Sequence, residues 1–258
     1  MFSSREVSDA VERVRAEHAP DALVLSCETD FETIPPAQAE ELGLVVDSLD
    51  PVSYPGEWLP ADAPDVLATY ASSELTIGMP GDGSVAWSRQ TEPPVVLCKP
   101  RLDGSPDSFV DFLIAEALVE VGLDEPEHML GFFGEAYPKF AEAVEGPLDP
   151  VGTYQLAVAC YDAYLGLQTR DSFAEWEGPL FEAWVDAGDR LASRLEELPS
   201  AIASDELSFP EAAELACNGI KHASELPAPF DALDATAYVD HGPSYAIEWA
   251  DRVAETLE

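Results

Sequence analysis

Residues 74–101 read ELTIGMPGDGSVAWSRQTEPPVVLCKPR, and this stretch differs in texture from the rest of the chain. Its three short runs ELTIG, VAWSR and VVLCK are rich in apolar, β-branched and aromatic residues, which favour strands. The segment GMPGDGS between the first two runs is typical of a hairpin turn, because turns require Gly, Pro and Asp. We therefore predict a small three-stranded antiparallel sheet over about residues 74–101.

On the C-terminal side of this stretch, the sequence predicts only helices. Ser105 and Pro106 are typical of a helix start, and the helix that they open runs to Gly122. This helix is apolar nearly all round, which indicates a buried position. Pro126 opens a second helix, which ends at Gly146.

Further helices follow toward the C-terminus, one of them marked by Ser208 and Glu211, which have the spacing of a capping box. Helices joined by short loops predict a mostly α fold of the α+β class. In this fold an irregular bundle of about six helices packs against the small antiparallel sheet.

On the N-terminal side of the predicted sheet, the signals are mixed. The run ALVLSC at residues 22–27 fits either a strand or a loop, and its pattern leaves both open. Pro35 and Pro36 open a helix whose apolar stripe extends from Leu42 to Leu49.

Two organisations of the chain fit these patterns. In the first, residues 1–104 form a mixed α/β part that holds the sheet, and residues 105–258 form a helical part. In the second, the whole chain is one cooperative domain, because 258 residues suffice for one large domain or two small ones.

The chain carries 51 acidic residues against 12 basic ones, for a formal net charge of -39. Because 47% of the residues are hydrophobic and the acids are dispersed, we expect a folded protein with an acidic coat. Such a coat repels itself in dilute buffer, whereas at about 1 M salt the Debye length falls to about 3 Å. Scarce lysine and dispersed acid therefore indicate a cytoplasm rich in salt.

The same charge limits the classes of partner. Nucleic-acid binding depends on basic stripes that release counterions from phosphates, and an acidic coat opposes it. Anionic membrane surfaces are disfavoured for the same reason. We expect neither nucleic acid nor a membrane as a partner, which leaves another protein or self-association.

Four cysteines stand far apart, at positions 27, 98, 160 and 217, and no C-x-x-C pair occurs. This spacing favours neither a zinc site nor a redox motif, and the apolar neighbours of each thiol are typical of buried, reduced cysteines. The N-terminal residues lack the pattern of a signal peptide, and no apolar run approaches the roughly 18 residues of a membrane span. We therefore expect a soluble, cytoplasmic protein.

Three stretches of the sequence carry a family resemblance: APDALVLSCETDFETIPP at 19–36, YPGEWLPADAP at 54–64 and GDGSVAWSRQTEPPVVLCKPR at 81–101. They resemble an uncharacterised family of halophilic archaeal proteins, a domain of unknown function, and the resemblance extends over the whole chain. It implies an origin in cells with concentrated salt. It implies no activity and no catalytic residues.

Signatures of catalysis are absent from the sequence. No G-x-G-x-x-G follows a predicted strand, and neither a phosphate-binding loop with its lysine nor H-E-x-x-H nor G-x-S-x-G occurs. The single Glu-x-x-His at 125–128 lies at a helix start, whereas di-iron bundles need two such pairs on mid-helix faces. We therefore expect no cofactor and no metal site, name no catalytic residue, and leave open whether the chain is an enzyme.

The basic residues are unevenly distributed, and three of the 12 lie between residues 84 and 101. Arg89, Lys99 and Arg101 share this stretch with Trp87. One interpretation is that the three cations hold a carboxylate or phosphate group beside the Trp87 indole. The other, which we favour, is that the cations pair with the protein's own abundant acids and lie over the sheet.

The length of the connection between the two strands decides whether these side chains converge. If residues 90–94 form a five-residue loop, Arg89 lies opposite Val95 and Trp87 opposite Leu97, and the cations line the rim of one apolar face. An even loop length would split the two sets of side chains across the sheet.

We interpret the chain as a non-catalytic cytoplasmic protein of a halophile, which works through protein–protein contact or as an accessory subunit. The alternative is an enzyme acting on a small anionic substrate, with Trp87, Arg89, Lys99 and Arg101 at its site.

Overall fold

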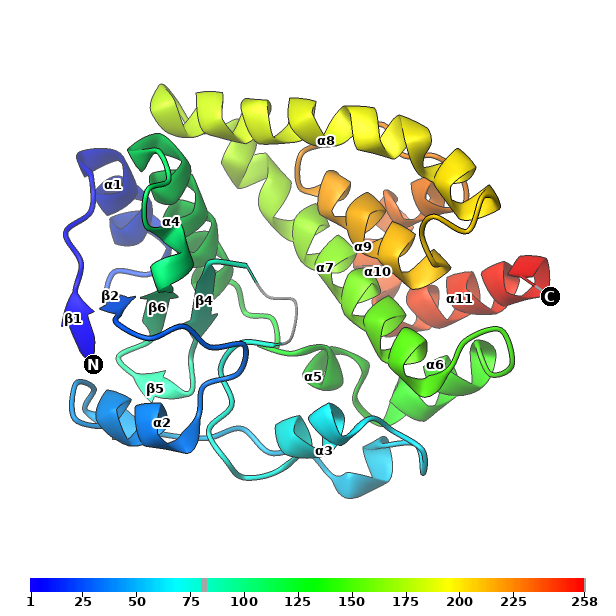
Figure 1. The fold of residues 1–258 in the computed structure, drawn as a ribbon, viewed down its shortest axis with the longest axis horizontal. Coiled ribbons are helices and arrows are strands. Elements are labelled where there is room, and N and C mark those ends of the chain that lie inside the picture. The colour runs from blue at the N-terminus through cyan, green and yellow to red at the C-terminus, as the bar shows by residue number, and fades with distance from the viewer. Residues whose placement is uncertain (80–82, 258) are drawn as a thin grey trace. The chain divides into compact units, whose positions relative to one another are not determined.

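A computed structural model of the chain describes residues 1–79 and 83–257 (Figure 1). These residues are mostly helical and include two small sheets, so the predicted mostly α, α+β class is confirmed. The chain divides into two compact units, each made of three segments. The first comprises Met1–Ser53, Thr69–Glu127 and Glu177–Ala183, and the second comprises Tyr54–Ala68, His128–Trp176 and Trp184–Glu258.

The first unit is built on a mixed sheet with the strand order β1-β2-β6-β4. Strands β2 and β6 run parallel at its centre, while β1 and β4 pair antiparallel at its edges. Every residue of β6 is buried, as its run of valine and leucine requires of a central strand. A second, antiparallel sheet joins β3 and β5. The bounds are β1 (Phe2–Ser4), β2 (Leu23–Cys27), β3 (Ser48–Leu49), β4 (Val85–Ser88), β5 (Thr91–Glu92) and β6 (Val95–Cys98).

The predicted three-stranded antiparallel sheet at 74–101 is correct only for the pair of β4 and β6. Residues 74–78 form no strand, and the buried Ile77 instead accepts a hydrogen bond at its carbonyl from the Ile34 amide at 2.8 Å. The other neighbour of β6 is β2, the run ALVLSC, which comes from far earlier in the chain. A long-range parallel pair leaves no local sequence pattern. Residues 80–82 of the predicted turn lie outside the described residues.

Helices α1 and α4 cover one face of this sheet, with α1 packed against α4 and α4 lying over β4 and β6 (Figure 1). The packing is close, because a Cβ atom on Gly122 would lie 2.5 Å from the carbonyl oxygen of His18. The opposite face packs against residues of the segment 31–46. The prediction of a buried helix that ends at Gly122 is confirmed. The bounds are α1 (Asp9–His18), α2 (Pro36–Leu42) and α4 (Asp107–Gly122).

The second unit is helical in its described residues, and its central pair is α7 and α9, which pack along each other. Helix α9 begins with the predicted capping box, because the Ser208 hydroxyl accepts a hydrogen bond from the Glu211 amide and the Glu211 carboxylate accepts one from the Ser208 amide. Helices α3 (Asp65–Ala71) and α8 (Pro179–Ala203) carry residues of both units. The remaining bounds are α5 (Met129–Phe133), α6 (Tyr137–Ala143), α7 (Pro150–Ala174), α9 (Phe209–Ile220), α10 (Thr236–His241) and α11 (Pro243–Leu257).

The prediction of about six helices is wrong, because the described residues hold more helices, several of them short. The helix predicted from Pro126 to Gly146, for example, is divided into α5 and α6. Gly134 follows α5 with a φ of 55°, a left-handed conformation that glycine adopts without strain. The interruption therefore lies at a glycine inside an otherwise helical pattern.

Candidate functional site

The pairing of β4 with β6 places the residues predicted to bind an anion. Ser88 lies opposite Val95, and Trp87 lies opposite Val96. The connection therefore spans residues 89–94, one residue longer than the loop that would gather the four side chains on one face. Because strand side chains alternate between faces, this single residue decides the arrangement.

The predicted site is consequently separated into two pairs of residues. Trp87 and Arg89 lie together, with the guanidinium carbon of Arg89 5.7 Å from the indole centroid. Lys99 and Arg101 lie near Phe31, whose ring centroid is 4.8 Å from Lys99 Nζ. The structure brings the members of each pair together, but it does not bring the four residues onto one face of the sheet.

Trp87 and Arg89 hold β4 against the end of α4. The indole Nε1 of Trp87 donates a hydrogen bond to the Glu120 carboxylate at 2.6 Å. The Arg89 guanidinium donates to the backbone carbonyls of Leu123 and Glu125, which directly follow the C-terminus of α4. A cation at this position complements the partial negative charge of a helix C-terminus. The guanidinium of Arg89 is therefore engaged by the protein's own carbonyl groups.

Arg101 is engaged by carboxylates. Its Nη2 lies 2.8 Å from Asp30 Oδ1 and 3.0 Å from Glu32 Oε1. The hydrogen bonds with Asp30 and Glu32 raise the pKa of Arg101, and the hydrogen bond from Arg101 lowers the pKa of Asp30. Lys99 is buried, with 1% of its surface exposed. Both arginines thus contact groups of the protein itself, which is the arrangement expected of structural cations.

A buried glutamine next to Arg89 organises the neighbouring loops. Its Nε2 donates to the Thr76 carbonyl and to Glu127 Oε1, each at 2.8 Å, and its Oε1 accepts from the Val52 amide at 3.1 Å. Burial raises the pKa of Glu127, while the hydrogen bonds from Gln90 and from the Arg89 amide act against that rise. Gln90 therefore fixes the position of Val52 and of the surface segment that precedes it.

That segment exposes four large apolar side chains within residues 44–52. The exposed fraction is 87% for Leu44, 41% for Val45, 37% for Leu49 and 41% for Val52. We call these four residues the 44–52 patch. Single exposed apolar residues are ordinary on protein surfaces, whereas several on one short segment mark a candidate binding surface.

The local geometry explains why these side chains are outside. Helix α2 ends at Leu42, and both Leu42 and Val46 are buried in the core of the first unit, which leaves the turn between them at the surface. The Leu49 side chain packs over this turn. Its Cδ1 lies 3.2 Å from the position that a Cβ atom on Gly43 would take. The patch is thus held to the unit by buried neighbours rather than extended on a free loop.

Backbone pairing fixes the second half of the segment. The amide of Asp47 donates to the Glu92 carbonyl at 2.7 Å, and the amide of Asp50 donates to the Gln90 carbonyl at 2.8 Å. These bonds flank the β3–β5 pair, in which Leu49 lies opposite Thr91. The exposed apolar side chains are therefore presented in a defined arrangement.

This surface was not predicted from the sequence, because Val45 and Leu49 fit the inward stripe of one long helix. The helix ends at Leu42 instead. The available signal was Gly43, because a glycine directly after an apolar residue commonly marks a helix C-terminus.

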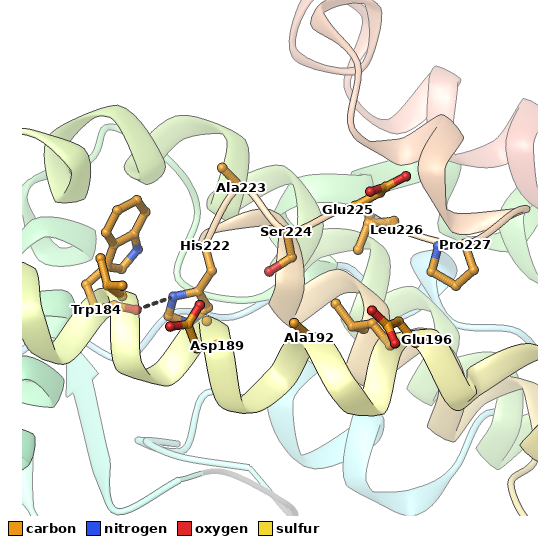
Figure 2. Close-up of a pocket in the computed structure, with 13 residues that line it drawn as sticks. Trp184, Asp189, Ala192, Glu196, His222, Ala223, Ser224, Glu225, Leu226 and Pro227 are labelled. Carbon is orange, nitrogen blue, oxygen red and sulfur yellow. Dashed lines mark hydrogen bonds between the residues drawn. The ribbon is translucent and has the colours of Figure 1, made fainter.

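A second surface feature is a hollow of about 500 Å³ in the second unit, between α8 and the turn that follows α9 (Figure 2). The indole of Trp184 and the imidazole of His222 stack with centroids 6.1 Å apart, and His222 Nδ1 donates to the Trp184 carbonyl at 3.1 Å. The lining also carries the carboxylates of Asp189, Glu196 and Glu225 and includes neither Lys nor Arg. The hollow therefore disfavours anions.

The turn beside this hollow has an unusual backbone. Ala223 adopts a φ of 51°, in the left-handed region that alanine seldom occupies. The Ser224 amide donates a hydrogen bond to the Gly219 carbonyl at 3.1 Å, and the Ala223 amide donates one to the Ile220 carbonyl at 3.0 Å. These two hydrogen bonds are the pattern of a Schellman motif. The strain is explained by this helix end, where glycine is the usual residue.

Across residues 1–79 and 83–257, no group of three or more His, Cys, Asp or Glu side chains could hold a metal ion. Within the same residues, no helix combines the length and the apolar character needed to cross a membrane. All four cysteines are buried.

Comparisons with other proteins agree with the extent of the family resemblance. No curated protein and no solved structure gives a significant match to this chain. A family model described as "Family of unknown function (DUF7089)" matches residues 1–257. The chain therefore belongs to the DUF7089 family, a family of unknown function whose model spans nearly the whole sequence.

Proposed function

We propose that the protein is a non-catalytic interaction or accessory protein that binds a partner protein through the 44–52 patch. We further propose that it acts in a cytoplasm with concentrated salt, as in a halophilic archaeon. The observation that carries the first proposal is the exposure of Leu44, 87%, together with that of three apolar neighbours.

Leaving this apolar surface in water has an energetic cost. Burial of a leucine or valine side chain stabilises a complex by about 1.5–3 kcal/mol relative to full exposure. Leu44, at 87% exposed, would gain most of this amount, whereas the other three patch residues, at 37–41% exposed, would each gain a smaller part. The segment is already ordered by buried Leu42 and Val46 and by the β3–β5 pair. Binding would therefore order few additional groups, which favours affinity.

The net charge of -39 supports the proposed environment. In dilute buffer the acidic coat repels itself and would also repel any acidic partner, whereas concentrated salt screens both effects. Apolar contact does not depend on unscreened charge, so the patch remains effective in such a solution.

The alternative proposal is an enzyme that acts on a small anion at Trp87, Arg89, Lys99 and Arg101. Arg89 contacts backbone carbonyls and Arg101 contacts carboxylates, so ligand binding would have to displace both sets of contacts. We therefore favour the interaction protein over the enzyme.

The test is quantitative co-purification from native extract in multimolar KCl, with mass spectrometry of the captured proteins. The double variant Leu44→Ser/Leu49→Ser removes the centre of the patch, and Val151→Ser is the matched control, because Val151 is a 54% exposed valine in the second unit. A partner that is lost with the double variant and kept with the control supports the proposal. Equal capture by wild type and the double variant would refute it.

A further inference from the structure

The charged side chains that border the 44–52 patch in sequence are all acidic. The chain from residue 16 to residue 88 contains no Lys or Arg. Within this stretch Glu40, Glu41, Asp47 and Asp50 border the patch in sequence, and all four are exposed. The side chains that flank the apolar residues in sequence thus carry one sign of charge only.

These carboxylates are largely not neutralised by the protein itself. Glu41 lies 3.0 Å from the N-terminal ammonium group of Met1. Among residues 1–79 and 83–257, no ion pair involves the carboxylates of Glu40, Asp47 or Asp50. Arginine residues form ion pairs with carboxylates outside the 44–52 patch, as Arg101 does with Asp30. The acids beside the patch therefore remain available to a partner.

Building on the proposed function, we infer that the partner presents an apolar segment flanked by Lys or Arg residues. The apolar centre would cover Leu44, Val45, Leu49 and Val52, and the flanking cations would meet Glu40, Asp47 and Asp50. Complementary charge at the rim of an interface selects the partner and speeds association, while the apolar centre supplies most of the affinity.

A second copy of the chain bound through its own 44–52 patch is disfavoured. It would place its own Glu40, Asp47 and Asp50 against the same residues, and each copy carries a net charge of -39. Like charges across an interface oppose association. The charge of the patch surroundings thus distinguishes a basic partner from self-association.

The experiment uses three fluorescent synthetic peptides and the full chain. The first peptide has a Val/Leu centre and Lys ends, the second has the same centre with Glu ends, and the third has a Ser/Gly centre with Lys ends. Binding is measured by fluorescence anisotropy over a range of KCl concentrations. The protein variants are Leu44→Ser/Leu49→Ser, the rim reversal Asp47→Lys/Asp50→Lys, and the control Val151→Ser.

We expect the first peptide to bind about tenfold more tightly than the second in moderate salt, since its Lys ends form several weak ion pairs with the rim while Glu ends meet like charge. This ratio should shrink as KCl rises, because salt screens the rim. The rim reversal should make the Glu-ended peptide the better ligand. The third peptide should bind weakly, and the patch variant should lose the first peptide while Val151→Ser keeps it.

Other results would overturn the inference in distinguishable ways. Equal binding of the Lys-ended and Glu-ended peptides would refute the basic partner and leave the proposed function standing. A dimer of the wild type that the patch variant abolishes would show that the occupant is a second copy. If no peptide binds and native capture does not depend on the patch, the proposed function itself fails.

Discussion

Replacing Arg89 distinguishes a structural cation from an anion-binding one. In the structure its guanidinium donates to the carbonyls of Leu123 and Glu125 just beyond α4. Arg89→Ala removes both bonds and the cation at the helix end. If this geometry is its role, the variant loses stability and binds anions no differently.

The expected loss follows from the number and kind of contacts. A hydrogen bond to a charged group contributes about 1.5–3 kcal/mol, and a cation near a helix C-terminus about 0.3–1 kcal/mol. The lower limits of these ranges add up to slightly more than about 3 kcal/mol for the two bonds and the helix end. Arg89 is only half-buried, so solvent screens its contacts and we expect a smaller total of about 2–3 kcal/mol. For a chain of this size, that corresponds to a fall in Tm of about 4–12 °C.

The assay is thermal unfolding followed by far-UV circular dichroism in concentrated KCl, with calorimetric titration of phosphate and citrate into wild type and variant. Arg89→Lys should recover part of the loss, because one ammonium group cannot match the two-pronged guanidinium. The matched control is Arg190→Ala, which removes an exposed pair with Asp186 and should cost no more than about 0.5 kcal/mol.

The reasoning would be refuted if Arg89→Ala melted within a degree or so of wild type while anion binding weakened. That result would mean that the guanidinium serves a ligand rather than the end of α4. It would also favour the alternative of an enzyme acting on a small anion.

Three further predictions concern salt, thiols and acid. Tm should rise by many degrees between dilute buffer and about 2 M KCl, because screening removes the repulsion of a -39 coat; a flat Tm would contradict the proposed high-salt environment. Burial raises the pKa of Cys27 to about 12 and of Cys98 to about 11, so a thiol reagent should label four cysteines only after denaturation, and fast native labelling would contradict this burial. Burial lowers the pKa of His128 to about 3, so its contribution to stability should be complete above about pH 6.5 and decline as pH falls toward 3. His128 Nδ1 caps α5 by accepting from the Leu130 amide, and His128→Asn should reduce this acid sensitivity; an unchanged pH profile by chemical denaturation would argue against it.

Local signals in the sequence predicted the helices that end at clear markers. The helix to Gly122 and the capping box of Ser208 and Glu211 are both present, because each depends on residues close together in the chain. The class of the fold followed from these elements.

Long-range pairing was not predictable in the same way. Strand β6 pairs with β2 in parallel, and no local pattern records which distant strand will be its neighbour. Residues 74–78 have a composition typical of a strand, yet they form a loop in which the Ile77 carbonyl accepts a hydrogen bond from the Ile34 amide. Tertiary contacts here override the local preference for a strand.

The arrangement of the predicted anion-binding residues depends on one additional residue in the connection between β4 and β6. The sequence placed Trp87, Arg89, Lys99 and Arg101 close together along the chain, and the length of the 89–94 connection then separated them into two pairs. The 44–52 patch went unpredicted because the apolar spacing from Leu42 to Leu49 fits one helical stripe, although the helix ends at Leu42, next to Gly43.

Photo-cross-linking from position 44 tests the central claim most directly. A benzophenone amino acid replaces Leu44 in one version of the chain and Val151 in another, and both are irradiated in native extract in concentrated KCl. We predict that position 44 cross-links to a defined protein, at a segment with apolar residues beside Lys or Arg, and that position 151 does not. Cross-links from position 44 that are no more abundant or specific than those from position 151 would contradict the account.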